Sequence, residues 1–151
     1  MLIPVALVLH VLAVVVWVGG MFFAHMALRP SVATLPPEVR LPLLGKIFAR
    51  FLPWVWASVL IILTTGYGAI FILFGSVVAV SHPIGVMMLL GNLMVGLFLY
   101  LWFFPYRRLQ SALAEHDIKA AGLQQVLIRR VILTNLVLGL VTISVATAGR
   151  W

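Results

Sequence analysis

The first stretch of the chain, Leu2–Leu28, decides the fold and reads LIPVALVLHVLAVVVWVGGMFFAHMAL. None of its 27 residues is Asp, Glu, Lys or Arg. A helix needs about 20 mostly apolar residues to cross the hydrocarbon core of a bilayer, whereas a secretory signal peptide has a shorter apolar segment that follows a basic one. We therefore expect this stretch to be a membrane-spanning helix that is retained in the mature protein.

Three further apolar runs follow at about Phe51–Phe74, Pro83–Phe104 and Val131–Ala148. Within lipid, only helices and closed barrels satisfy every backbone polar group, and these runs are about twice as long as barrel strands. Helices joined by short loops form antiparallel neighbours. The sequence thus predicts an all-α membrane protein, a four-helix up-down transmembrane bundle whose single domain covers residues 1–151.

The composition agrees with a membrane protein and excludes several other classes. Of the 151 residues, 64% are hydrophobic and only 9% are charged, and the mean hydropathy is +1.22. About a quarter of the residues in a soluble domain are charged, so a soluble enzyme and a disordered chain are excluded. The net charge of +7 sits in short gaps between apolar runs, not in the dense exposed patch that nucleic acid requires. The absence of cysteine excludes disulfides and thiolate metal sites.

The basic residues predict the orientation of the bundle. Nine of the ten Lys and Arg residues lie in the two segments that follow the first and third apolar runs, and the tenth is Arg150. Loops that are rich in Lys and Arg stay in the cytoplasm. We therefore expect both chain ends to lie outside, in the periplasm, and the protein to be a multi-pass protein of the bacterial inner membrane.

His10 is the most informative polar residue in the apolar runs. It lies about 10–12 Å below the outer end of the first helix, and a polar side chain at such a depth is costly without a partner. Neutral imidazole is a common metal ligand, and Trp17 lies on nearly the same helix face at about 100° per residue. The position suits haem iron or copper, or a histidine that is hydrogen-bonded to a neighbouring helix.

Depth along the four helices indicates which residues can meet His10. The third helix runs in the same direction as the first and brings Met88 near the level of His10, and the second helix brings Tyr67 to that level. His82, at the outer boundary of the third helix, is a candidate axial ligand or a contact of a haem propionate. The predicted cofactor site contains His10, His82, Met88, Trp17 and Tyr67, with metal bonds from His10, His82 and Met88.

The remaining polar and small residues are predicted to serve helix packing. Asn92 and Asn135 are expected to form hydrogen bonds between helices. The segment Ser31–Arg50 is a candidate short interfacial helix. No carboxylate lies at membrane depth, so no catalytic residue is predicted. Several glycines permit close helix contact, namely Gly19, Gly20, Gly66, Gly68, Gly91, Gly96 and Gly139.

Four stretches carry a resemblance to a known family: His10–Phe23 (HVLAVVVWVGGMFF), Phe51–Trp56 (FLPWVW), Phe104–Leu109 (FPYRRL) and Ile128–Gly139 (IRRVILTNLVLG). Together they resemble the small CopD-like (copper-resistance D) integral membrane proteins. The first stretch is also similar to the first helix of HemJ-type protoporphyrinogen oxidases, in which the matching histidine binds haem b. That similarity implies a haem-ligand role for His10, while the family name implies copper handling.

These observations leave three functional hypotheses open. The first is a protein that holds haem b between helices near the outer leaflet and transfers electrons, as a candidate membrane oxidoreductase with a redox partner or quinone. The alternative is a copper-binding or copper-transport protein, and the third is a structural or assembly subunit without a cofactor. In each case the lipid bilayer is the surrounding partner and a homo-oligomer is a candidate assembly.

Overall fold

The computed structural model describes residues 2–78 and 80–148, and the elements of this part of the chain are helices. In chain order they are α1 (Leu2–Phe23), the π-helix η1 (Ala24–Leu28), α2 (Arg29–Val32), α3 (Pro37–Phe74), α4 (His82–Leu101), the π-helix η2 (Trp102–Tyr106), α5 (Arg107–Ala114) and α6 (Ile118–Ala148). They form four continuous segments that are long and apolar enough to cross a membrane: Leu2–Val32, Pro37–Phe74, His82–Ala114 and Ile118–Ala148. The predicted all-α membrane bundle is therefore confirmed.

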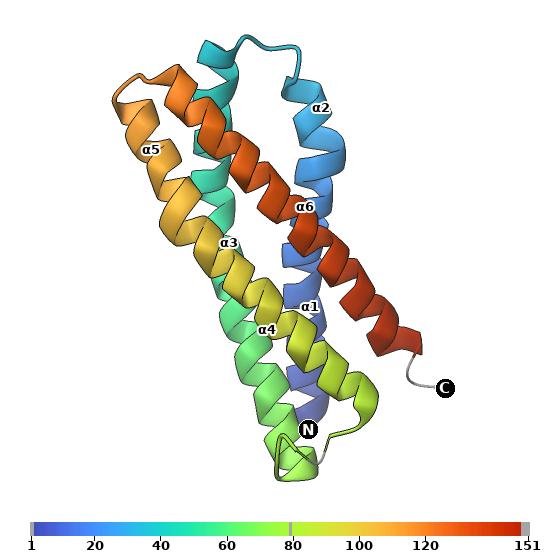
Figure 1. Cartoon of the computed structure of the whole chain (residues 1–151). Helices are drawn as coiled ribbons and strands as arrows, with labels where there is room; N and C mark the ends of the chain where they lie inside the picture. Colours follow the sequence, from blue (N-terminus) through green and yellow to red (C-terminus); the bar gives the residue numbers. More distant parts are fainter. Residues whose placement is uncertain (1, 79, 149–151) are drawn as a thin grey trace.

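The bundle consists of two helical hairpins with the same order of elements. In each hairpin an α-helix continues through a π-helix into a short α-helix, and a tight turn then leads into a long helix. The most extensive pairings are α1 with α3 and α4 with α6. The start of α1 and the end of α6 lie at the same end of the bundle as the connection between α3 and α4, which is the arrangement of an up-down bundle (Figure 1).

A proline accompanies each π-helix and explains why the helix widens there. Pro30 follows η1 by two residues, and Pro105 lies inside η2. A proline ring lacks an N–H and clashes with the carbonyl four residues earlier, which here belongs to Met26 or to Leu101. A wider turn removes the clash without ending the helix. As a result, each of the two helices continues beyond its apolar run into a charged segment.

The interfacial helix predicted within Ser31–Arg50 is not a separate element. The structure ends α2 at Val32 and begins α3 at Pro37, and α3 then continues through Arg50 into the second span despite two internal prolines. Leu41, Leu44 and Phe48 are buried in the common core. Their packing against other helices outweighs the hydrogen bonds lost at the prolines, so the segment extends the span.

Helix packing at the centre of the bundle relies on a small residue. A Cβ atom added at Gly139 would lie 2.9 Å from Cγ2 of Val18 and 3.2 Å from Cε of Met94. Helices α1, α4 and α6 therefore meet at this glycine. One turn away, Asn135 is buried and its Nδ2 donates a hydrogen bond to the Met94 carbonyl over 3.1 Å. The predicted interhelical hydrogen bond of Asn135 is thereby confirmed.

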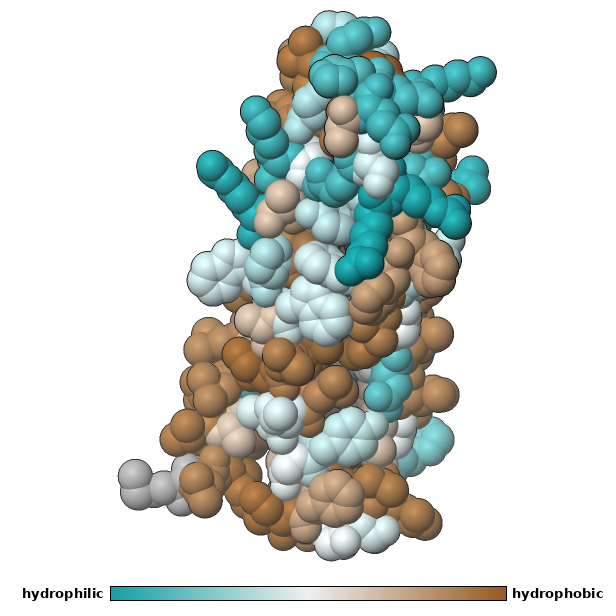
Figure 2. All heavy atoms as spheres, turned by 90° about the vertical axis from the view of Figure 1, so that its left-hand side faces the viewer, coloured by the Kyte–Doolittle hydropathy of each residue, from teal (hydrophilic) through white to brown (hydrophobic). Residues whose placement is uncertain are grey.

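The surface divides into a hydrophilic end and a long hydrophobic remainder. Figure 2 shows the hydrophilic side chains over the end formed by α2, α5 and the starts of α3 and α6, with hydrophobic side chains over most of the rest. This is the end that carries the basic segments. Arg150, the basic residue predicted for the opposite side, lies outside the described residues.

Candidate functional site

His10 faces α3, and its ring is held there by a hydrogen bond. Nδ1 of His10 lies 2.9 Å from the hydroxyl oxygen of Thr65. The next residue, Gly66, is what allows the ring to lie so close, because a Cβ atom there would be 3.2 Å from Cε1 of His10. The close pairing of α1 with α3 thus places the imidazole against one short segment of the second span.

The hydrogen bonds of Thr65 determine which ring nitrogen carries the proton. The hydroxyl oxygen of Thr65 lies 2.5 Å from the carbonyl oxygen of Ile61, to which it donates its single hydrogen. It must therefore accept the hydrogen from Nδ1 of His10. In the neutral imidazole this leaves the lone pair on Nε2, the arrangement in which a histidine binds a metal ion while its other nitrogen is held by a partner.

Trp17 lies about two turns from His10 and belongs to the packed core. It is buried, and its ring meets the edge of Phe98 on α4 with 6.1 Å between the ring centroids. Trp56 of α3 packs against the same Phe98 ring at 5.1 Å. These aromatic contacts join α1, α3 and α4 on the side of the predicted site that faces the basic end of the bundle.

Tyr67 and the turn that contains Met88 are linked through Asn92. The Nδ2 of Asn92 donates to the hydroxyl of Tyr67 over 2.6 Å and to the carbonyl of Met88 over 2.9 Å. The first of these bonds confirms that Asn92 connects two helices. Together the two bonds place the hydroxyl of Tyr67 beside the turn of α4 that holds the Met88 carbonyl.

The level of Met88 relative to His10 follows from the contact at Gly139. Helices α1 and α4 run in the same direction, and Val18 and Met94 meet at that glycine. Eight residues back along each helix, about 12 Å, lie His10 and Val86. Met88 is therefore close to the level of His10, although α1 packs mainly on α3 and α4 mainly on α6.

His82 lies at the outer end of the bundle. It is the first residue of α4 and is exposed. Ten residues separate it from Asn92, which corresponds to about 15 Å along the helix. Within residues 2–78 and 80–148, no group of three or more His, Cys, Asp or Glu side chains is placed to hold a metal ion. A bound metal would thus depend on His10 with softer or weaker ligands, and the roles of His82 and Met88 stay predictions.

Thr65 is the residue that sequence reasoning missed. A threonine within an apolar helix usually bonds to a carbonyl of its own helix, and Thr64, Thr134, Thr142 and Thr147 all do so. Only the rotation of α3 against α1 distinguishes Thr65 from these others. One signal for Thr65 was available in the sequence: it lies two residues from Tyr67, which the count of residues along the second helix had placed at the level of His10.

Comparison with known proteins supports one of the functional hypotheses. A family model described as Copper resistance protein D matches residues 45–148, which is more than half of the chain. No curated protein and no solved structure matches the chain. The matched range covers most of α3 and all of α4 to α6, so α1 and His10 lie outside it. The family description agrees with the copper hypothesis and not with the haem hypothesis. The chain, a multi-pass helical membrane protein, therefore belongs to the copper resistance protein D family.

Proposed function

We propose that the protein binds copper within the membrane, as a copper-binding or copper-transport protein in which His10 is a ligand. Two observations support this proposal: the family membership and the hydrogen bond by which Thr65 holds the His10 ring. The hydrogen bond is the observation that supports His10 as the ligand, because it leaves Nε2 free to bind copper.

The donor atoms available near this level suit Cu(I). Copper is here the cargo of the protein, and Cu(I) prefers soft ligands such as thioethers together with imidazole. Met87 and Met88 are partly buried on α4, near the level of His10. The chain has no cysteine, and a site without carboxylates or thiolates favours a singly charged ion in a low-dielectric environment.

We further propose a bacterial inner-membrane location with both chain ends in the periplasm, as the distribution of basic residues predicts.

The haem hypothesis remains the competing proposal because a free Nε2 would serve haem iron equally well. It would add a second axial ligand from His82 or Met88 and a redox role with a quinone or protein partner. One measurement separates the two. The absorption spectrum of the protein purified in detergent shows a Soret band with reducible α and β bands if haem b is bound, and no visible band if Cu(I) is bound.

The copper proposal is tested by anaerobic titration of the detergent-purified chain with Cu(I) against a chromogenic chelator. We expect stoichiometric binding that is lost in His10→Ala. His116→Ala is the matched control, because His116 is exposed in the turn between α5 and α6 and should leave binding unchanged. Equal Cu(I) affinity in both variants would show that His10 is a structural histidine. A haem spectrum that disappears in His10→Ala would replace copper with haem.

A further inference from the structure

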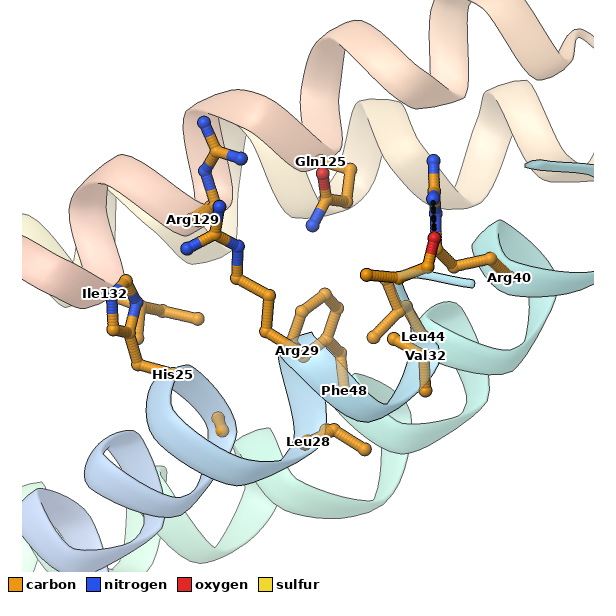
Figure 3. A pocket seen from close by; sticks show the side chains of 12 residues that line it. His25, Leu28, Arg29, Val32, Arg40, Leu44, Phe48, Gln125, Arg129 and Ile132 are labelled. Carbon is orange, nitrogen blue, oxygen red and sulfur yellow. Dashed lines mark hydrogen bonds between the residues drawn. The ribbon is translucent and has the colours of Figure 1, made fainter. Parts of the chain in front are cut away.

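A cavity of about 180 Å³ lies at the hydrophilic end of the bundle (Figure 3). It is lined by the segment from η1 to the end of α2, by the start of α3 and by α6, and it is open to the outside at Arg29, which is exposed. Its volume is far above the ~10–15 Å³ that one water needs. Its polar side chains can all donate hydrogen bonds: His25, Arg29, Arg40, Gln125 and Arg129. None of the described residues that line it is acidic.

Three positive charges from three segments of the chain converge on this cavity. Figure 3 shows the guanidinium groups of Arg29 and Arg129 at the same side of the cavity, with Gln125 beside them and Arg40 farther along. Nη1 of Arg40 donates to the carbonyl of Ala33 over 3.2 Å, which ties this arginine to the rim. Like charges repel, and the repulsion grows as the surroundings become less polar. An anion between them would convert the repulsion into attraction.

The opposite wall of the cavity is apolar. Val32, Leu44 and Phe48 are buried core residues that also line it. A site with a basic side and an apolar side suits an amphiphilic ligand better than a small hydrated ion. It is also unsuitable for a metal cation, because the three arginines repel a positive charge.

The depth of the cavity places it beside the lipid headgroups. Helix α3 has 38 residues and is about 57 Å long, whereas the hydrocarbon core is about 30 Å thick. The lining residues Phe48 and Arg129 lie only three and two residues before the predicted apolar runs that begin at Phe51 and Val131. The cavity is thus next to the boundary of the hydrocarbon core, at the level of lipid phosphates.

We propose that this cavity binds a phosphate group, and that the phosphate belongs to the headgroup of an anionic phospholipid. Guanidinium groups bind phosphate oxygens through paired hydrogen bonds, and basic pockets between membrane helices accept anionic headgroups. The apolar wall would contact the glycerol and the upper acyl chain. The same phosphate chemistry is available from a soluble phosphate, which the test distinguishes. The site is separate from His10 and does not depend on the copper proposal.

The test uses the full chain, delipidated in a neutral detergent, and compares two adjacent arginines on α6. Arg129 lines the cavity, whereas Arg130 is exposed and is not among the lining residues. Arg129→Gln and Arg130→Gln lose the same charge from the same helix, so they differ only in whether the cavity is affected. Binding of dioleoylphosphatidylglycerol, of dioleoylphosphatidylcholine and of inorganic phosphate is measured by native mass spectrometry, and circular dichroism checks that each variant is folded.

We expect phosphatidylglycerol to bind more tightly than phosphatidylcholine, and Arg129→Gln to weaken phosphatidylglycerol binding about ten-fold or more. Arg130→Gln should stay within about two-fold of the unchanged protein. Arg129→Lys, which keeps the charge but not the paired hydrogen bonds, should fall between them. Equal losses in Arg129→Gln and Arg130→Gln would overturn the proposal, since binding would then follow net charge alone. Loss of inorganic phosphate binding in Arg129→Gln with unchanged phosphatidylglycerol binding would overturn the lipid assignment in favour of a soluble phosphate.

Discussion

Replacing Thr65 by valine tests whether this residue prepares His10 to bind a metal ion. Valine has nearly the shape of threonine, so the packing between α1 and α3 should be kept while the acceptor for Nδ1–H is lost. The imidazole would then be free to carry its proton on Nε2, where it blocks the ligand lone pair. Loss of such a hydrogen-bond partner costs about 10–100-fold in metal affinity, which corresponds to about 1.4–2.8 kcal/mol.

The assay is the anaerobic Cu(I) competition titration, carried out on two variants at Thr65 and one at the neighbouring Thr64. Thr65→Val should weaken Cu(I) binding by the stated factor, whereas Thr65→Ser keeps the hydroxyl and should stay within about three-fold of the original affinity. Thr64→Val is the matched control, because the Thr64 hydroxyl bonds only to carbonyls of its own helix. If Thr65→Val and Thr64→Val bind Cu(I) equally well, the role assigned to Thr65 is refuted, whatever the role of His10 itself.

Three further predictions concern the bundle. Gly139→Ala should lower stability in detergent by about 1–3 kcal/mol, because the added methyl group overpacks against Val18. Gly96→Ala is the control and should not lower stability, because an added Cβ there has nothing within 4 Å. Equal melting temperatures of the two variants would contradict the packing described at Gly139. Asn135→Leu should change stability by only about 0.6 kcal/mol, because its Oδ1 has no partner among the described residues; loss of Cu(I) binding in this folded variant would place the site elsewhere. Reporter fusions should show Ser76 in the periplasm and Ala112 in the cytoplasm, and the reverse result would invert the topology.

The sequence by itself determined that the chain crosses the membrane as helices. Four apolar runs without charge are sufficient for that conclusion, because lipid offers no hydrogen-bond partner and each backbone group must be satisfied within its own helix. Depth is also readable from sequence, since every residue adds a fixed rise along a helix. This is why Met88 could be placed near the level of His10. Asn92 and Asn135 could be recognised as links between helices because each is a polar residue within an apolar run.

Tertiary structure alone decided which side chains face one another. The partner of His10 depends on the rotation of α3 about its axis, and that rotation is set by packing between helices, as where Gly66 admits the imidazole ring. The segment after Pro37 is helical because its leucines are buried by other helices, a gain that its local sequence does not reveal. The arginine-lined cavity likewise exists only because α2, α3 and α6 meet at one end of the bundle. Contacts between residues distant in sequence carry no periodic signal along the chain, so they follow from the packed bundle and not from any one helix.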